Sequence, residues 1–244
     1  NSLKRGDYTL WSSPVATSES LTLINFSALT SQSPNRFYVY DNTLGTNGLF
    51  ANIAPSSTFA TGTGYLIRMP NENPTELGTS SAYYTAGADI TFNGEFVGVP
   101  NNGTLTTTGL TADKFYSIGN PYPSNLSADL FINGNSTGGT LYFWRKTNAA
   151  IGTAYATYTL AGGVGTDAGI GGLGAPSGII APCQGFIVKT GAAATTLTFT
   201  NAMRLTNATY GKFFKTKQEA TKDRVWLNLT NAAGAFSQIG RAHV

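Results

Sequence analysis

The chain of 244 residues is poor in charge, in cysteine and in histidine. Charged residues make up 11% of it, against about 25% in typical soluble domains. The single cysteine, Cys183, excludes an internal disulfide, and the single histidine, His243, stands next to the last residue. No apolar run approaches the roughly 18 residues of a membrane-spanning helix, so we expect no membrane span. These shortages exclude a disulfide-stabilised scaffold and leave few side chains for acid–base or nucleophilic chemistry.

Other residue types are plentiful. Hydrophobic residues reach 41% and aromatic residues 12%, which is enough to build a core and argues against disorder. Solubility must come from Ser, Thr, Asn and Gly in place of charge. This profile is typical of exported β-proteins, whose strands favour threonine and aromatic side chains.

One pattern of segments occurs twice along the chain. Four segments return in the same order: Tyr8–Pro14 as Phe115–Pro121, Phe37–Tyr40 as Leu141–Trp144, Gly64–Arg68 as Gly185–Lys189, and Ile90–Phe92 as Leu197–Phe199. The offsets are 107, 104, 121 and 107 residues. Solenoid repeats have periods of roughly 20–50 residues, so this spacing indicates a repeated domain-sized unit.

Strand signals dominate both copies. Eight short aromatic or β-branched runs are bounded by Gly, Pro, Asn or Ser: Tyr8–Ser13, Arg36–Asp41, Gly64–Met69, Ala88–Asn93, Thr140–Arg145, Tyr155–Leu160, Gly185–Thr190 and Thr195–Thr200. Asn-Gly pairs, which suit tight hairpin turns, lie between several of them. We therefore predict an all-β protein of two tandem β-sandwich (jelly-roll-like) repeats, at residues 1–110 and 111–204.

The C-terminal part differs in character. Residues 1–203 hold eight basic and ten acidic side chains, so the net charge of +3 arises in the tail. We predict a linker and a truncated third β-unit at 205–238, since the strand-like Arg224–Leu229 follows a polar basic stretch. Residues 239–244 look like a frame translation of a sequencing adapter and are expected to be a cloning or assembly scar. Because the repeats are slightly acidic, no nucleic-acid partner is predicted.

Two motifs suggest catalytic or cofactor chemistry, and each has a structural alternative. The glycine-rich segment Gly162–Gly178 contains Gly169–Gly174, which matches the dinucleotide fingerprint, but Ala175-Pro176 and another strand follow where a helix is needed. The segment therefore reads as an inserted hairpin loop. Glu72 and Glu76 are the closest carboxylates, yet neighbouring prolines deny them a common helical face. A glycosidase pair formed by acids that are distant in sequence stays an alternative.

Cys183 and a few loop carboxylates are further candidates for reactive or metal-binding roles. Cys183 corresponds to Gly62 in the first copy, which favours a small apolar filler over a nucleophile. Asp41–Gly45 and Asp167 supply oxygen atoms for calcium, but ordinary Asx-turns explain them equally well. We predict no metal and no cofactor.

Aromatic residues give a sharper hypothesis. In Leu141–Trp144 the alternation of a strand sends Tyr142 and Trp144 to one face and Leu141 and Phe143 to the other. An exposed Tyr142/Trp144 face, extended by Tyr155 and Tyr158, would stack on sugar rings. The alternative is packing, because the first copy carries Tyr38 and Tyr40 at equivalent places.

The most distinctive short motif is Asn120–Ser124, with two prolines around a tyrosine. Each proline pushes the residue before it into an extended conformation, and either preceding peptide bond is a candidate for the cis form. We predict a rigid corner at the end of a strand.

These motifs resemble a repeated β-module near the C-terminus of large exported proteins of Bacteroidetes-type bacteria, including substrates of the type IX secretion system. The matching segments are Ile118–Ser124, Thr140–Trp144, Ile180–Lys189, Thr198–Arg204 and Val225–Leu229, with a looser match at Trp11–Pro14 and Gly64–Ile67. The motifs are structural, so they indicate a family more than an activity.

The resemblance implies a non-catalytic module of a secreted or cell-surface bacterial protein, located outside the cell or on its outer surface. The expected role is that of an adhesin or a structural spacer ahead of a C-terminal sorting domain, which would engage the export machinery. Surface glycans or other cell-surface components are the expected partners. The alternative is a carbohydrate-binding accessory module of an exported hydrolase, with Tyr142, Trp144, Tyr155 and Tyr158 as its binding residues.

Overall fold

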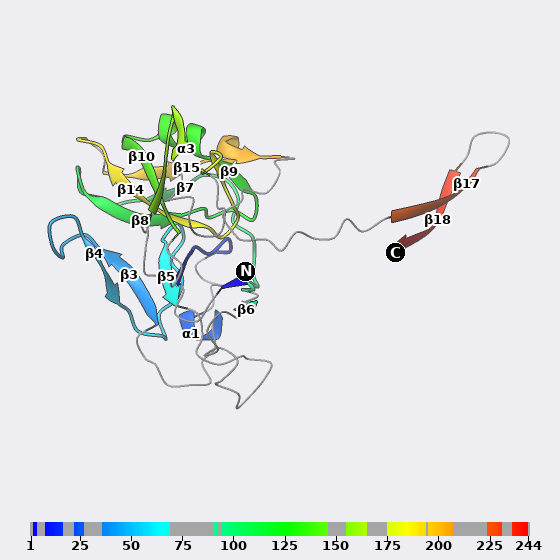
Figure 1. Cartoon of the computed structure of the whole chain (residues 1–244), viewed down its shortest axis with the longest axis horizontal. Helices are drawn as coiled ribbons and strands as arrows, with labels where there is room; N and C mark the ends of the chain where they lie inside the picture. Colours follow the sequence, from blue (N-terminus) through cyan, green and yellow to red (C-terminus); the bar gives the residue numbers. More distant parts are fainter. Residues whose placement is uncertain are drawn as a thin grey trace.

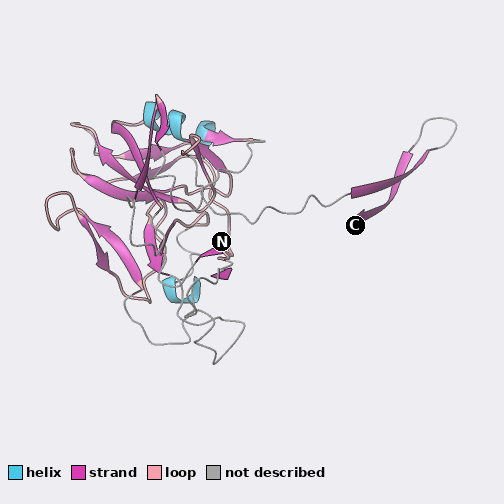
Figure 2. Cartoon of the chain, viewed as in Figure 1, coloured by secondary structure: helices cyan, strands magenta, loops and turns pink. Residues whose placement is uncertain are grey.

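The computed structural model confirms an all-β protein built from several antiparallel sheets (Figures 1 and 2). It describes residues 2–3, 8–16, 22–26, 36–68, 90–91, 94–145, 155–164, 175–193, 195–206, 224–230 and 236–243. Helices in this part of the chain are short: α1 (Leu23–Phe26), α3 (Ala128–Gly134) and the 3-10 turn η2 (Asn201–Met203). Each of the eight predicted strands overlaps an observed strand.

Two sheets form the centre of the fold. The first has the order β2-β5-β3-β4, with β2 at Tyr8–Trp11, β3 at Phe37–Asp41, β4 at Leu49–Asn52 and β5 at Tyr65–Arg68. The second has the order β12-β11-β10-β14-β8, with β8 at Phe115–Gly119, β10 at Thr137–Trp144, β11 at Tyr155–Thr159, β12 at Gly162–Val164 and β14 at Gly185–Thr190. Read from β8, the second sheet has the order β8-β14-β10-β11, which corresponds strand by strand to β2-β5-β3-β4 in the first. The second sheet has one additional strand, β12, which lies at the start of the predicted glycine-rich insertion.

The pairing registers of the two sheets also correspond. Side chains that stand opposite each other in one sheet have their sequence equivalents opposite each other in the other. Examples are Trp11 with Tyr65 and Ile118 with Phe186, Tyr38 with Leu66 and Tyr142 with Ile187, and Tyr40 with Phe50 and Trp144 with Tyr155. A one-residue slip would exchange the two faces of a strand, so a shared register means that equivalent residues face equivalent surroundings.

The two short helices repeat as well, although no pattern in the sequence predicted them. Thr22 and Ser127 begin them, and each hydroxyl accepts a hydrogen bond from the backbone N–H three residues later, at 3.3 and 3.2 Å. Such caps satisfy amides that the first turn leaves without partners. A helix of one or two turns carries too little periodicity to be recognised among strand signals.

Short sheets complete each copy. β1 (Ser2–Leu3) pairs with β6 (Ile90–Thr91), and β7 (Leu105–Thr107) pairs with β15 (Leu197–Phe199) in the equivalent way. The second copy also has the sheet β13-β9-β16, formed by Ile179–Ile180, Asn125–Ser127 and Arg204–Leu205. β7, which lies before the predicted boundary at residue 110, thus pairs with a strand that lies after it.

A separate hairpin forms the C-terminal part. β17 (Arg224–Thr230) pairs with β18 (Phe236–His243). The predicted strand of the third unit lies in β17. The six residues interpreted as a scar lie at the end of the chain, and all but the last belong to β18. Of the predicted linker, residues 207–223 lie outside the described residues.

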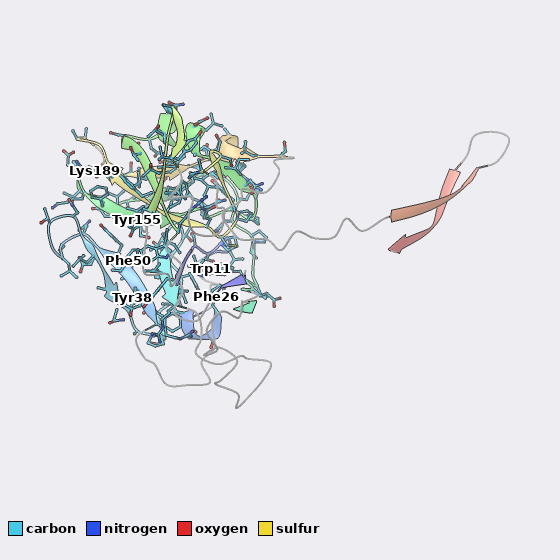
Figure 3. All side chains as sticks on the ribbon, viewed as in Figure 1. Trp11, Phe26, Tyr38, Phe50, Tyr155 and Lys189 are labelled. Atoms are coloured by element: carbon cyan, nitrogen blue, oxygen red, sulfur yellow. The ribbon has the colours of Figure 1, made fainter. Side chains whose placement is uncertain are left out.

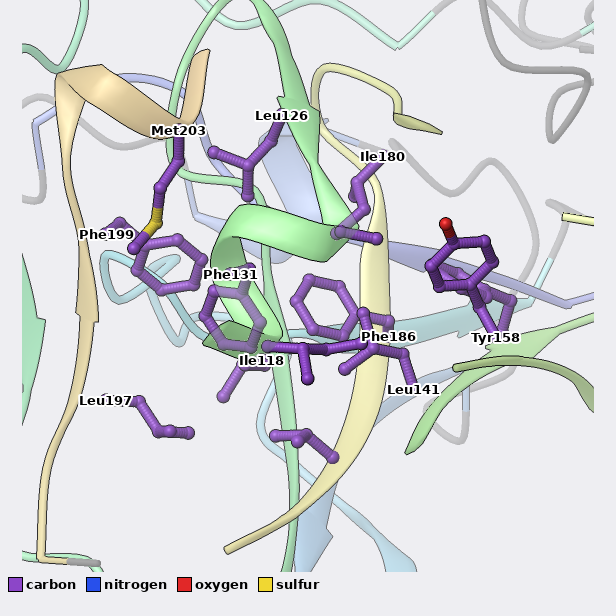
Figure 4. Packing of buried hydrophobic residues seen from close by; sticks show 14 of the residues in the cluster. Ile118, Leu126, Phe131, Leu141, Tyr158, Ile180, Phe186, Leu197, Phe199 and Met203 are labelled. Atoms are coloured by element: carbon purple, nitrogen blue, oxygen red, sulfur yellow. The ribbon is translucent and has the colours of Figure 1, made fainter. Parts of the chain in front are cut away.

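Three hydrophobic clusters lie around the two central sheets. The first lies on the outer face of the second sheet, beneath α3, and contains Phe131, Phe186 and Phe199 (Figure 4). The second lies on the outer face of the first sheet, around Phe26 and Phe59. The third contains residues from both sheets, which therefore pack face to face.

Candidate functional site

The predicted alternation of Leu141–Trp144 is confirmed. Leu141 and Phe143 are buried in the cluster beneath α3, while Tyr142 and Trp144 join the cluster between the two sheets. The cause is the two-residue period of a strand, which separates neighbouring side chains onto opposite faces. The face that carries Trp144 is therefore turned toward the first copy.

This face belongs to what we call the inter-sheet aromatic cluster. Its rings come from both copies: Tyr8, Tyr38, Tyr40, Phe50, Phe115, Tyr142, Trp144 and Tyr155. Leu10, Leu66 and Ile187 are buried among them. Figure 3 labels Tyr38, Phe50 and Tyr155 in the region where the two sheets approach each other.

Ring geometry within the cluster is repeated between the copies. The ring centroids of Tyr8 and Tyr38 lie 5.8 Å apart, and those of the equivalent pair, Phe115 and Tyr142, also lie 5.8 Å apart. The Tyr40–Phe50 pair, at 5.2 Å, has its equivalent in Trp144–Tyr155 at 5.3 Å. All four are edge-to-face contacts, a favourable arrangement of aromatic quadrupoles.

Trp144 connects the two sheets. Its ring centroid lies 6.3 Å from that of Tyr8 and 6.3 Å from that of Phe50, both in the first copy. Burial together with the nearby Tyr40 raises the pKa of Tyr155. Three of the four rings predicted to stack on sugars, Tyr142, Trp144 and Tyr155, thus make edge-to-face contacts with other rings of the same chain.

Tyr158 does not belong to this face. It stands opposite Leu141 in the β10–β11 ladder and is 7% exposed in the cluster beneath α3. Its hydroxyl donates to Asp129 Oδ1 at 2.7 Å, and burial with this carboxylate raises the pKa of Tyr158 to about 12. Tyr155 and Tyr158 are three residues apart, an odd spacing that puts them on opposite faces of the strand. The prediction of one surface formed by all four aromatic residues is therefore wrong.

Reciprocal backbone contacts join the copies at the ends of β2 and β8. Ser12 N–H donates to Cys183 C=O at 2.8 Å, and the equivalent Gly119 N–H donates to Gly62 C=O at 3.1 Å. When residue i contacts j and the equivalent of j contacts the equivalent of i, the interface has two-fold character. The two copies therefore pack around an approximate two-fold axis.

Ser12 and its own equivalent, Gly119, meet at this axis. A Cβ atom added to Gly119 would overlap Ser12 Cβ and lie 2.8 Å from Ser12 Oγ and 3.0 Å from Gln184 O. The Ser12 hydroxyl is buried and has no hydrogen-bond partner in the described part of the chain. Glycine is needed on one side because the two backbones approach too closely for two side chains.

Cys183 occupies a turn position that the repeat explains. Its φ is 63°, and its equivalent, Gly62, has φ of 73°. Each turn is closed by a backbone hydrogen bond of 3.2 Å, from Gln184 N to Ala181 O in the second copy and from Thr63 N to Ala60 O in the first. The Cys183 side chain packs against the cluster of the first copy, and burial raises the pKa of its thiol to about 12. This geometry fits the predicted role as a small filler.

The corner at Asn120–Ser124 follows the end of β8, as predicted. The buried Asn120 amide donates to Ser124 O at 2.7 Å and to Ala181 O at 3.1 Å, and its oxygen accepts from Tyr122 N at 3.0 Å. No cis peptide bond occurs among the described residues, so both prolines of the corner are trans there. The Asn120 side chain thus links the corner to the segment that follows β13 (Ile179–Ile180).

The remaining candidate positions do not assemble into a site within the described residues. Asp41 Oδ1 accepts from Thr43 N at 2.9 Å and from Thr43 Oγ1 at 2.7 Å, so it forms the Asx-turn given as the alternative to calcium. These hydrogen bonds lower the pKa of Asp41. Over that same part of the chain, no group of three acidic, histidine or cysteine residues is suited to a metal. Glu72, Glu76, Asp167 and Gly169–Gly174 lie outside the described residues.

Two important polar residues, Asn101 and Arg204, were not predicted from the sequence. The buried amide of Asn101 donates to Val15 O at 3.1 Å and to Pro121 O at 3.0 Å, and so ties the corners of both copies together. Arg204 stacks on Tyr122, with its guanidinium carbon 5.2 Å from the ring centroid. Both residues make contacts with segments far away along the chain, and no local pattern announces such contacts.

Comparison with known proteins adds a family and no activity. No curated protein and no solved structure matches the chain. Over the described residues, no helix is both long and apolar enough to cross a membrane. The model of a family described as a domain of unknown function (DUF8693) matches residues 1–242. The match spans both copies and β17, and it extends into the last six residues. The chain therefore belongs to this family, the domain of unknown function DUF8693.

Proposed function

We propose that this chain is a non-catalytic module of a secreted or cell-surface bacterial protein, with an adhesin-like or structural spacer role ahead of a C-terminal sorting domain. The low charge, the threonine- and aromatic-rich strands and the resemblance to type IX secretion substrates support this proposal. The resemblance also supports a location outside the cell or on its outer surface.

The inter-sheet aromatic cluster carries the spacer proposal. Domains in one chain move relative to each other unless the interface between them is large and hydrophobic. Here eight aromatic rings lie between the sheets, and reciprocal backbone hydrogen bonds join the strand ends. A rigid two-copy block of this kind holds a neighbouring domain at a fixed distance from a surface.

The proposal is tested in a bacterium that carries the full-length gene. The chain is replaced by a flexible Gly/Ser linker of equal length, and both versions are followed by protease shaving and antibody labelling of intact cells. We expect both proteins on the surface, with weaker adhesion or weaker function of the upstream part for the linker version. A parent protein that stays inside the cell, or equal adhesion with the linker, would contradict the proposal.

A carbohydrate-binding role through the predicted aromatic residues has less support. Tyr142, Trp144 and Tyr155 contact other rings of the chain, and Tyr158 is buried on the opposite face. Glycan arrays with the parent chain and Trp144→Ala test it directly. Sugar binding that this substitution removes without unfolding the protein would restore the alternative.

A further inference from the structure

Arg204 lies at the centre of a polar cluster on the second copy. Its Nε donates to Ser124 Oγ at 2.8 Å, and its Nη1 donates to Asn102 Oδ1 at 3.0 Å and to Asn201 Oδ1 at 3.2 Å. The guanidinium also lies over the buried Tyr122 ring at 5.2 Å. Four neighbours therefore fix its orientation before any ligand arrives.

The chemistry of arginine determines which amide atoms of this cluster are left to bind a ligand. A guanidinium can only donate hydrogen bonds, so each asparagine must turn its amide oxygen toward Arg204. The Nδ2 groups of Asn102 and Asn201 are then left to donate elsewhere. In the described part of the chain, neither Nδ2 group nor Arg204 Nη2 has a hydrogen-bond partner. Three N–H₂ groups are thus available, and both asparagines are exposed.

The charge of Arg204 has no acidic partner within the described residues. The ion pair found there joins Lys189 and Asp113, 3.3 Å apart. Ser124 and the two asparagines that contact Arg204 are neutral. A positioned guanidinium surrounded by neutral groups attracts an oxyanion, and charge-assisted hydrogen bonds to such a group are stronger than neutral ones.

The first copy shows that the fold does not require this cluster. By the offset of 107 residues, Arg204 corresponds to Val97, Tyr122 to Val15 and Asn201 to Gly94. The described part of the equivalent corner, 13–16, forms there without a guanidinium, a tyrosine ring or an asparagine amide at these three places. The cluster is therefore an addition to the repeated scaffold.

We propose that Arg204, Asn102 and Asn201 form a binding site for an acidic saccharide. The guanidinium Nη2 would hold a carboxylate or sulfate group, and the two amides would donate to ring hydroxyl oxygens. An acidic sugar carries both kinds of acceptor within a few ångströms, which matches one cation between two neutral donors. The site does not rest on the spacer role, so its failure would leave that proposal intact.

Affinity electrophoresis and titration followed by NMR test the site on the full chain. The probes are an oligogalacturonate for the carboxylate, a sulfated oligosaccharide for the sulfate, a neutral oligogalactose and inorganic sulfate. An acidic peptide represents a protein partner. We expect binding to one or both acidic saccharides, weakened by salt, and weaker binding or none to the other three probes.

Three variants separate the site from general charge. Arg204→Gln should weaken binding by about tenfold or more, because hydrogen bonds to a charged group are lost. Lys114→Gln, the matched control, removes one exposed positive charge just before β8 and should leave affinity within about twofold. Asn102→Asp supplies Arg204 with an internal carboxylate and should abolish binding while keeping or raising the melting temperature.

Each result decides for or against the site. Loss of binding in Arg204→Gln and Asn102→Asp, with retention in Lys114→Gln, supports it. No binding of either acidic saccharide by the parent, equal losses in Arg204→Gln and Lys114→Gln, or unchanged binding by a folded Asn102→Asp would overturn it. Preference for the acidic peptide would assign the site to a protein ligand and overturn the saccharide proposal.

Discussion

Gly119 provides the most direct test of the two-fold packing. A side chain at this position would meet its own repeat equivalent, Ser12, with Ser12 Oγ 2.8 Å from the new Cβ atom. Neither backbone can move freely, because Ser12 N–H and Gly119 N–H both donate across the interface. We expect Gly119→Ser to destabilise the chain by about 2 kcal/mol, the middle of the range for overpacked cores. In a protein of this size the melting temperature should fall by about 4–8 °C.

The approximate symmetry also predicts the stability of a double variant at the same pair of positions. Ser12→Gly empties the other side of the axis, so Ser12→Gly with Gly119→Ser restores one glycine and one serine in exchanged places. The double variant should recover at least about 1 kcal/mol relative to the sum of the single changes, as neighbouring sites do when they share one contact.

Thermal and urea unfolding of the four proteins measure this coupling. Gly138→Ser is the control, because a Cβ atom there comes no closer than 3.4 Å to Lys189 Cβ; its stability should change by less than about 0.5 kcal/mol. A Gly119→Ser variant as stable as the parent, or additive effects of the two changes, would refute the close approach of the copies at this axis.

Three other perturbations have defined outcomes. Trp144→Ala should cost about 3 kcal/mol in urea unfolding, because it opens a cavity between the sheets; a loss below about 0.5 kcal/mol would argue against packing by this ring. Asn120→Asp should destabilise the chain at pH 7, because the introduced carboxylate would face the carbonyl oxygens that accept hydrogen bonds from the Asn120 amide. Stability should partly return toward pH 4, where the carboxylate becomes protonated. Unchanged stability at pH 7 would contradict the role of this amide. The thiol of Cys183 should resist iodoacetamide at pH 8 until urea unfolds the chain, since burial raises its pKa to about 12. The free energy of unfolding should fall as pH rises from 9.0 toward about 12, because the thiol ionises at lower pH in the unfolded chain than in the folded one. In Cys183→Ala the free energy of unfolding should fall less steeply over the same pH range.

Much of the strand framework could be predicted from local sequence. Segments such as Gly185–Thr190 carry β-branched and aromatic residues between turn formers, and the observed β14 has the same bounds. The repeat added information, because equivalent segments had to form equivalent strands. Shorter elements such as β4 and α1 were missed, since three to five residues carry too weak a pattern.

The candidate aromatic site shows where prediction from sequence ended. Alternation correctly separated Tyr142 and Trp144 from Leu141 and Phe143, because side-chain direction in a strand depends only on its two-residue period. It did not tell what covers the face that carries Trp144. An aromatic face looks the same in sequence whether it meets a sugar, water or another sheet.

By itself, the sequence determined the all-β class and the direction of alternate side chains, since these depend on neighbours along the chain. Only the tertiary structure decided that the aromatic faces of the two copies meet each other. It also brought Arg204 to Asn102, 102 residues away along the chain. Contacts of this kind depend on how separate segments pack, and packing is a property of the whole fold with no local signal.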